Sequence, residues 1–272
     1  MITNRAQYST VKAIIKRISK KILKIPLKKR GPKKGSFFIY GLEMRDFETD
    51  LMDIFNRLLG HFGPQRWWPV DDPALDPAPF EIAVGSILTQ NTNWKNVESA
   101  LKNLKYENLL TPEKIDSTPE EILSSLIRPS GYFRVKAKRL KNYTSYLMEK
   151  YHGDIKASLE GELSDRRKEL LQVNGIGPET ADSILLYAGE RPTFVIDAYT
   201  KRALIRHKIA ADNLKYEEYQ SLFHNALFGN GDDEIVKLFN EYHALFVACG
   251  KRYCRPKNPR CDQCPLKDNN II

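Results

Sequence analysis

Apolar residues recur with a helical period along most of the chain. The segment MRDFETDLMDIFNRLLGHFG, which begins at Met44 and stops at Gly60 and Gly63, places five apolar side chains on one face: Phe47, Leu51, Ile54, Phe55 and Leu58. The same period predicts further helices near residues 81–89, 93–104, 119–127, 134–151, 162–172, 178–187, 200–207, 216–228 and 234–247. The only short β-branched apolar run is Thr193–Ile196. The pattern therefore predicts an all-α fold.

The basic charge of the chain is concentrated at its N-terminus. Residues 1–40 contain 12 Lys and Arg and no Asp or Glu, so the net charge of +9 comes from this segment. Thr10–Ile25 would form a basic amphipathic helix if folded. We expect residues 1–43 to be a solvated, partly disordered tail. A role at DNA, at a membrane surface or in targeting remains open, as does a natural start at Met44.

The segment LQVNGIGPETA, residues 171–181, predicts a helix, a tight turn and a second helix. Gly175 and Gly177 allow the turn, and Pro178 suits the first position of the second helix. The amide groups at such a helix start can bind a phosphate oxygen without sequence preference. A plain structural turn is the alternative.

Asp197 follows the apolar run at the mouth of another predicted helix. Its carboxylate could simply cap that helix. A fixed negative charge after a phosphate-binding hairpin is also what base excision requires, because the N-glycosidic bond breaks through a sugar cation. The carboxylate stabilises that cation and can orient or deprotonate the attacking water.

The pair VNGIGPETA and PTFVID resembles the hairpin and Gly/Pro–Asp motif of the endonuclease III superfamily, with Asp197 at the essential aspartate. The stretches WWPVDDP, PFEIAVGSILTQNTNWKNV and RPSGYFRVKAKRL look like the endonuclease III-type 3-methyladenine DNA glycosylases. The resemblance implies a two-lobed fold: a helical barrel over 85–192 and a discontinuous lobe over 44–84 and 193–272. Duplex DNA with a damaged base would lie in the groove between the lobes.

Glu179 stands where bifunctional members carry the lysine that forms a Schiff base. A carboxylate cannot form an imine, so we expect a monofunctional enzyme that leaves an abasic site. The resemblance implies that the released base is an alkylated purine. Lys168 or Lys201 could substitute for the lysine. The alternatives are an endonuclease III-like lyase on oxidised pyrimidines and a non-catalytic DNA-binding or metal-sensing module.

By the same resemblance, Gln90 is the wedge that fills the space left by the flipped nucleotide. A helix C-cap is the alternative reading of Gln90. The walls of the base pocket are Trp67, Trp68, Pro69 and Trp94, whose rings would attract a cationic purine, although at least one tryptophan could be a core residue. Phosphate contacts are expected from the hairpin and a basic loop: Gly175, Gly177, Glu179, Thr180, Arg255 and Lys257. Tyr132 and Lys136 are weaker pocket or phosphate candidates.

All four cysteines fall in the last 24 residues, which indicates a metal site in a reducing compartment rather than a disulfide scaffold. Cys254, Cys261 and Cys264 resemble the first three ligands of the four-iron cluster of endonuclease III relatives. The fourth is expected near Asn270, and Cys249 is the available substitute. Zinc or free thiols are alternatives. No apolar run approaches a membrane span, and we expect a monomer that is cytoplasmic and associated with the nucleoid.

Overall fold

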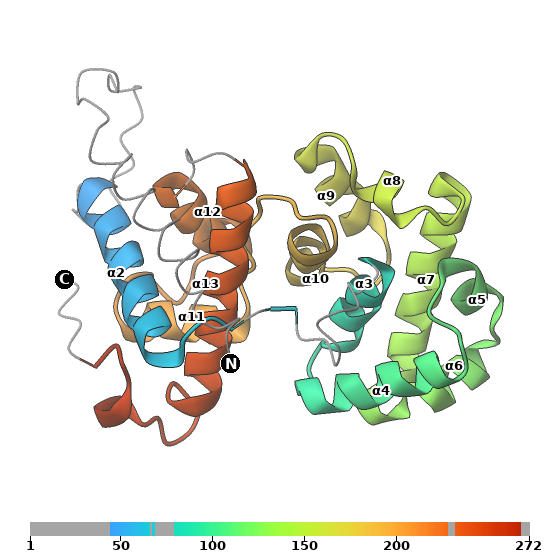
Figure 1. Cartoon of the computed structure of the whole chain (residues 1–272), viewed down its shortest axis with the longest axis horizontal. Coiled ribbons are helices and arrows are strands. Elements are labelled where there is room, and N and C mark those ends of the chain that lie inside the picture. Colours follow the sequence, from blue (N-terminus) through green and yellow to red (C-terminus); the bar gives the residue numbers. More distant parts are fainter. Residues whose placement is uncertain (1–43, 66, 69–78, 228–231, 268–272) are drawn as a thin grey trace, which may run out of the picture. The chain divides into compact units, whose positions relative to one another are not determined.

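The computed structural model describes residues 44–65, 67, 68, 79–227 and 232–267 (Figure 1). Within these ranges the chain is built from helices joined by short connections, and no strand is present. The prediction of an all-α fold is confirmed. The N-terminal tail, Pro69 and Asn270 lie outside the described residues.

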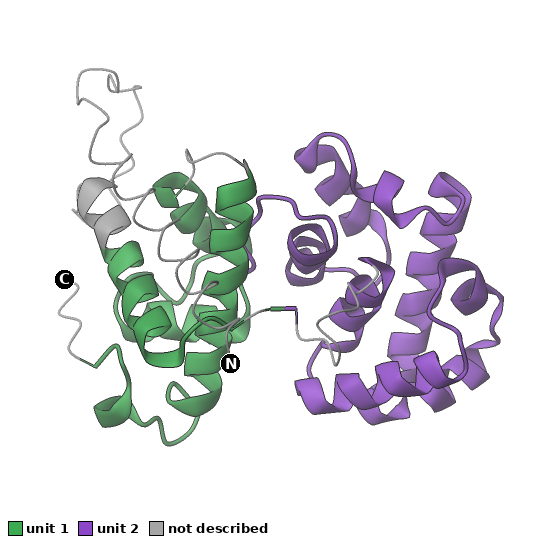
Figure 2. Ribbon diagram, in the orientation of Figure 1, with its two compact units in different colours: residues 1–67, 196–272 green, residues 68–195 purple. Residues whose placement is uncertain are grey.

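The chain divides into two compact units (Figure 2). Unit 1 comprises residues 1–67 and 196–272, and unit 2 comprises residues 68–195. The sequence predicted the first boundary after residue 84. That position falls inside one continuous helix, α3 (Pro79–Leu88), which packs against α4, α7 and α10 of unit 2. The boundary therefore lies before α3.

Unit 1 is built from α2 (Met44–Phe62), α11 (Ala198–Arg206), α12 (Tyr216–Leu227) and α13 (Asp232–Arg252). Helix α13 packs against both α2 and α11. Tyr242 lies at the centre of an aromatic core with Phe55, Phe223 and Phe246, and its hydroxyl donates a 2.6 Å hydrogen bond to the carbonyl oxygen of Leu51. This bond satisfies the one polar atom of a fully buried ring, so α2 and α13 are held in a fixed register.

Unit 2 surrounds α3, in which eight of ten residues are buried. Four helices contact it: α4 (Trp94–Tyr106), α7 (Phe133–Tyr151), α8 (Ile155–Leu159) and α10 (Pro178–Ser183). Helices α5 (Pro112–Ser117) and α6 (Glu120–Leu126) pack on α7, and α9 (Leu163–Gln172) packs on α10. Helix α10 continues into a π-helical turn, Ile184–Ala188, whose five side chains are all buried. A helix buried on all sides needs no amphipathic pattern, which explains why α3 reads as one apolar run.

Candidate active site

Asp197 lies at the start of α11, after an extended run in which Phe194, Val195 and Ile196 are buried. The residue is 8% exposed, and Oδ1 accepts a 2.7 Å hydrogen bond from the amide of Thr200. Asp197 is thus the N-cap residue of α11, which is the capping role that the sequence offered as an alternative. The cap uses one oxygen, so capping and a chemical role are compatible.

His243 of α13 faces the second oxygen of Asp197, with 3.5 Å between Nε2 and Oδ2. Burial alone would raise the pKa of the Asp197 carboxyl. The charge and hydrogen bond of His243, together with the Thr200 amide, outweigh burial, and the pKa is lowered. Asp197 is therefore held as a carboxylate. His243 was not predicted from the sequence, and its one signal was a histidine inside the apolar stretch of α13.

Gly250 allows α11 and α13 to approach closely. A methyl group at this position would lie 2.3 Å from Cδ1 of Tyr199, so the tyrosine ring packs directly on the α13 backbone. Asp197 lies two residues before Tyr199. This close contact fixes the first turn of α11 against the helix that carries His243.

The predicted hairpin forms in unit 2 between α9 and α10. Gly175 has φ of +97°, and a Cβ there would lie 2.2 Å from Cγ of Arg139. Gly177 is the N-cap of α10 with φ of −94°, and Pro178 takes the first helical position. No side chain caps the first turn of α10. Its leading amides therefore have the arrangement that suits a phosphate oxygen.

Gln90 lies just beyond α3, and its side chain is bonded to the hairpin. Nε2 donates to the carbonyl oxygen of Gly175 at 3.0 Å and to Oγ1 of Thr180 at 2.8 Å. Oε1 accepts a hydrogen bond from Nη1 of Arg139. Thr180 is buried, so any phosphate contact of this residue falls to its backbone. Arg139, which was not singled out in the sequence, links α7 to both Gln90 and Gly175.

Two of the three tryptophans belong to one aromatic cluster in unit 2. The ring of Trp68 lies edge-on to that of Trp94 at 5.0 Å between centroids and 5.4 Å from that of Tyr187. Both tryptophans are half-buried, and Nε1 of Trp94 donates to Glu98. Trp67 belongs to unit 1, where Lys251 lies over its ring. Tyr187 comes from the π-helical turn and was not predicted.

Lys136 is buried rather than placed to meet a phosphate. Its Nζ donates to the carbonyl oxygens of Leu88 at 2.8 Å and Ser130 at 2.6 Å. Burial and the neighbouring charge of Arg139 lower the pKa of Lys136 to about 8. The lysine holds the end of α3 against the turn before α7. Tyr132, in that turn, is 72% exposed with φ of +45°.

The remaining lysine and glutamate candidates differ in exposure. Glu179 and Lys168 are exposed. Lys201 in α11 lies over the rings of Tyr216 and Tyr219, at 5.8 Å and 5.3 Å from their centroids.

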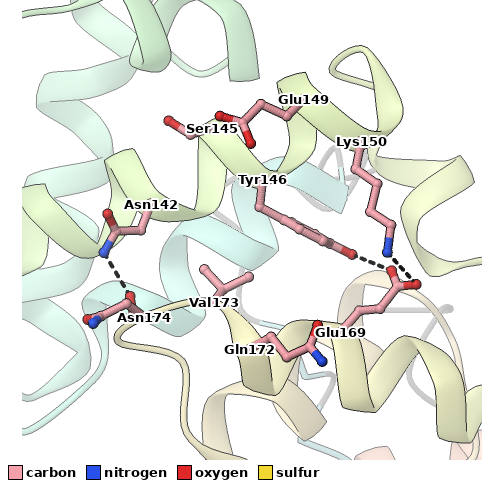
Figure 3. Close-up of a pocket in the computed structure, with 9 residues that line it drawn as sticks. All are labelled: Asn142, Ser145, Tyr146, Glu149, Lys150, Glu169, Gln172, Val173 and Asn174. Atoms are coloured by element: carbon pink, nitrogen blue, oxygen red, sulfur yellow. Dashed lines mark hydrogen bonds and ion pairs between the residues drawn. The ribbon is translucent and has the colours of Figure 1, made fainter.

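A pocket of about 570 Å³ opens between α7 and α9 of unit 2 (Figure 3). Tyr146 and Lys150 point toward Glu169, with a 2.6 Å ion pair from Lys150, while Asn142 donates to the carbonyl oxygen of Asn174. Hydrogen bonds and nearby cations, working against partial burial, lower the pKa of Glu169 to about 2. The pocket lies between α7 and the residues that lead into the hairpin, and none of the predicted catalytic residues lines it.

The four cysteines gather at the C-terminal end of unit 1. Cys249, Cys254 and Cys264 are buried, and Cys261 is exposed. The Cys249 and Cys264 sulfur atoms are 3.8 Å apart. The hydrogen bond between these two thiols lowers the pKa of Cys264 to about 7 and, with burial, raises that of Cys249. Nη1 of Arg206 lies 3.4 Å from the Cys254 sulfur. The donor set thus offers four thiols beside a guanidinium, which fits an anionic iron–thiolate cluster.

Comparison with known proteins decides the family. Residues 84–227 match the family model of the HhH-GPD superfamily base excision DNA repair proteins, which is more than half of the chain. The chain belongs to this superfamily. Residues 254–269 match the iron–sulfur binding domain of endonuclease III. This HhH-GPD protein is therefore a DNA N-glycosylase with a 4Fe–4S cluster, and the predictions of family, enzyme class and cofactor are confirmed.

Individual proteins that are similar to this chain carry the names of DNA glycosylases or of endonuclease III. A protein of Methanocaldococcus jannaschii whose name places it among DNA repair glycosylases is 44% identical over 79% of this chain and 93% of its own. Endonuclease III of Thermotoga maritima is 30% identical over 70% and 82%. The structure of H. pylori 3-methyladenine DNA glycosylase bound to 1,N6-ethenoadenine is similar with 27% identity and a TM-score of 0.61, over 77% of this chain and 98% of that one.

None of the helices in the described part of the chain is long and apolar enough to cross a membrane.

Proposed function

We propose that this HhH-GPD glycosylase is monofunctional and hydrolyses the N-glycosidic bond of an alkylated purine in duplex DNA, with Asp197 as its catalytic residue. The observation that carries the proposal is the buried carboxylate of Asp197, kept ionised beside His243. A fixed negative charge in a site of low dielectric stabilises a developing sugar cation far better than one in water.

The reaction then needs little from the protein beyond that charge. The base leaves with the electron pair of the N-glycosidic bond, and an alkylated purine already carries the positive charge that this pair neutralises. Water adds to C1′ of the sugar, and its proton passes to Asp197 or to solvent. No general acid is needed to protonate the base. The products are the free base and an abasic site.

The parts of unit 2 that resemble family sites would hold the substrate. The first-turn amides of α10, with Gly175 and Gly177 before them, bind a phosphate. Gln90 fills the space left by the extruded nucleotide. The aromatic cluster of Trp68, Trp94 and Tyr187 offers faces to a cationic purine. The H. pylori relative, whose name includes 3-methyladenine, supports this class of lesion.

Glu179 supports the monofunctional mechanism. A primary amine is required for the imine that precedes strand cleavage, and the exposed carboxylate at this position cannot supply one. The endonuclease III of Thermotoga maritima, at 30% identity, favours the second candidate, a lyase on oxidised pyrimidines. We further propose that the enzyme acts as a monomer, and its location in the nucleoid stays a prediction.

Release of free base from a panel of duplexes tests the substrate. The panel holds methylated purines, uracil or thymine opposite guanine, and oxidised pyrimidines, each assayed under single-turnover conditions. The proposal predicts release of the methylated purine and no cross-link to abasic DNA with borohydride. Release of oxidised pyrimidines together with a borohydride cross-link would overturn both the substrate and the mechanism in favour of the lyase.

A further inference from the structure

The iron–sulfur match accounts for only three of the four thiolates that a 4Fe–4S cluster takes. Cys254, Cys261 and Cys264 fall within the matched residues 254–269. A cubane cluster held by cysteines takes one thiolate at each iron. The chain has four cysteines in all, so the remaining one is Cys249, which lies outside the match.

The backbone at the end of α13 brings Cys249 to the cysteine loop. The amide of Cys254 donates a 3.0 Å hydrogen bond to the carbonyl oxygen of Cys249, and the amide of Tyr253 donates to the same oxygen at 2.8 Å. This wide turn returns the chain alongside the last turns of the helix. Cys249 and Cys254 are therefore neighbours although four residues separate them.

The side chain of Cys249 faces the loop as well. It is 1% exposed, and its sulfur lies 3.8 Å from that of Cys264. Cys264 follows a short 3₁₀ turn, Cys261–Gln263, which brings this cysteine to α13. Among the described residues no three metal-ligating side chains converge closely enough to hold a single ion. A four-iron cluster takes one thiolate at each iron, so the Cys249 and Cys264 sulfur atoms would have to move apart from this contact to bind it.

Two arginines of α11 lie beside the cysteine loop. Arg206 contacts the sulfur of Cys254 and the carbonyl oxygen of Arg255, while Nε of Arg202 donates to the carbonyl oxygen of Cys254 at 2.6 Å. Four thiolates on an iron–sulfur core leave a net negative charge, which such guanidinium groups stabilise. These arginines therefore place positive charge beside the cysteine loop that Cys249 contacts.

We propose that Cys249 is the fourth thiolate ligand of the 4Fe–4S cluster, so that the cluster is anchored to α13 as well as to the loop. This inference concerns the cofactor and does not depend on the identity of the excised base. Helix α13 also carries His243, six residues before Cys249. The proposed ligand would therefore connect the cluster to the helix that faces Asp197.

The test compares full-length variants purified without oxygen. Iron and acid-labile sulfide are measured per chain, with absorbance and electron paramagnetic resonance spectra of each protein. The wild type is expected to hold about four irons per chain. Cys249→Ala should lose at least one iron per chain and the wild-type spectrum, and Cys254→Ala should do the same. Val247→Ala, which removes buried atoms two residues away on α13, should keep both.

Cys249→Ser keeps the size of the side chain and serves as the decisive variant if the alanine protein does not fold. Its oxygen is a harder ligand than sulfur, so a ligand at this position predicts an altered spectrum with folding retained by circular dichroism. Retention of four irons and an unchanged spectrum in either folded Cys249 variant would overturn the proposal. A Cys249–Cys264 disulfide in the iron-loaded wild type would overturn it equally.

Discussion

His243 and Asp197 form a buried pair in unit 1, with 3.5 Å between the imidazole Nε2 and the carboxylate Oδ2. The pair explains how the carboxylate of a residue that is only 8% exposed stays ionised. Burial penalises the charge, and the interactions with His243 and the Thr200 amide more than offset that penalty. Removing either partner should therefore change the protonation of Asp197, and the consequence can be measured.

We expect His243→Asn to move the acid side of the pH–rate profile of base release to higher pH. A lowered folded-state pKa keeps the carboxylate charged until the pH falls through that value. Without the imidazole, only the Thr200 interaction opposes the effect of burial, so the pKa of Asp197 rises. Protonation of Asp197 then begins at a higher pH. His224→Asn replaces another histidine of unit 1, stacked on Phe239, and should leave the profile unchanged. Identical profiles for all three proteins would contradict the assignment.

Gly175 and Gly177 should respond differently to alanine. Gly175→Ala places a Cβ in a left-handed conformation and against Arg139, which should lower the free energy of unfolding by about 2–4 kcal/mol. Gly177 has negative φ, and a methyl group added there would meet no atom within 4 Å, so Gly177→Ala should change stability by less than about 1 kcal/mol. Urea unfolding measures both. Equal losses would show that strain at Gly175 does not govern the turn.

The hairpin also depends on a buried ion pair. Asp182 of α10 is fully buried, and its two oxygens accept bonds of 2.8 Å and 3.1 Å from Arg167 of α9. Arg167→Met leaves the buried carboxylate of Asp182 without its cationic partner, which should lower the free energy of unfolding by about 3–5 kcal/mol. The exposed neighbour Lys168 supplies the control, because Lys168→Met should alter stability by less than about 0.5 kcal/mol. A small effect of Arg167→Met on thermal unfolding would refute this role.

Gln90 and Arg139 should behave as a coupled pair. Their direct hydrogen bond and shared contact with Gly175 predict that the double alanine variant differs from the sum of the single variants by about 0.5–3 kcal/mol in unfolding free energy. Lys141 lies two residues further along α7 and donates instead to the carbonyl oxygens of Ile115, Asp116 and Thr118. The Gln90 and Lys141 substitutions should therefore add, and coupling of similar size in both cycles would argue against the Arg139 contact.

The long helices were predictable because each needs an amphipathic face to pack. The two short helices, α5 and α8, were not predicted because five or six residues are too few to show a period. Each begins at a side-chain cap, Thr111 or Asp154, which is a weak signal by itself. The π-helical turn of Ile184–Ala188 was read as a plain extension of α10, since apolar periodicity does not distinguish the two hydrogen-bond patterns.

The candidate site also has residues that the sequence predicts and residues that it does not. Asp197 and the hairpin glycines could be found from the sequence, because each needs a special residue type at a fixed local spacing. His243 and Arg139 could not, since they meet their partners across 46 and 49 residues and through packing of whole helices. The reading of Lys136 as a phosphate or pocket candidate did not foresee that its ammonium group lies buried against two carbonyl oxygens. Lysine more often lies at the surface.

The most direct test of the account is single-turnover base release by Asp197→Asn. Asparagine keeps the size of the side chain and an oxygen for the Thr200 amide but carries no charge. On the best duplex of the panel, the variant should release base at least about 100-fold more slowly than the wild type. Its affinity for that duplex should stay within about threefold of the wild-type value, since the hairpin is intact. Release at the wild-type rate would contradict the central role of the Asp197 charge.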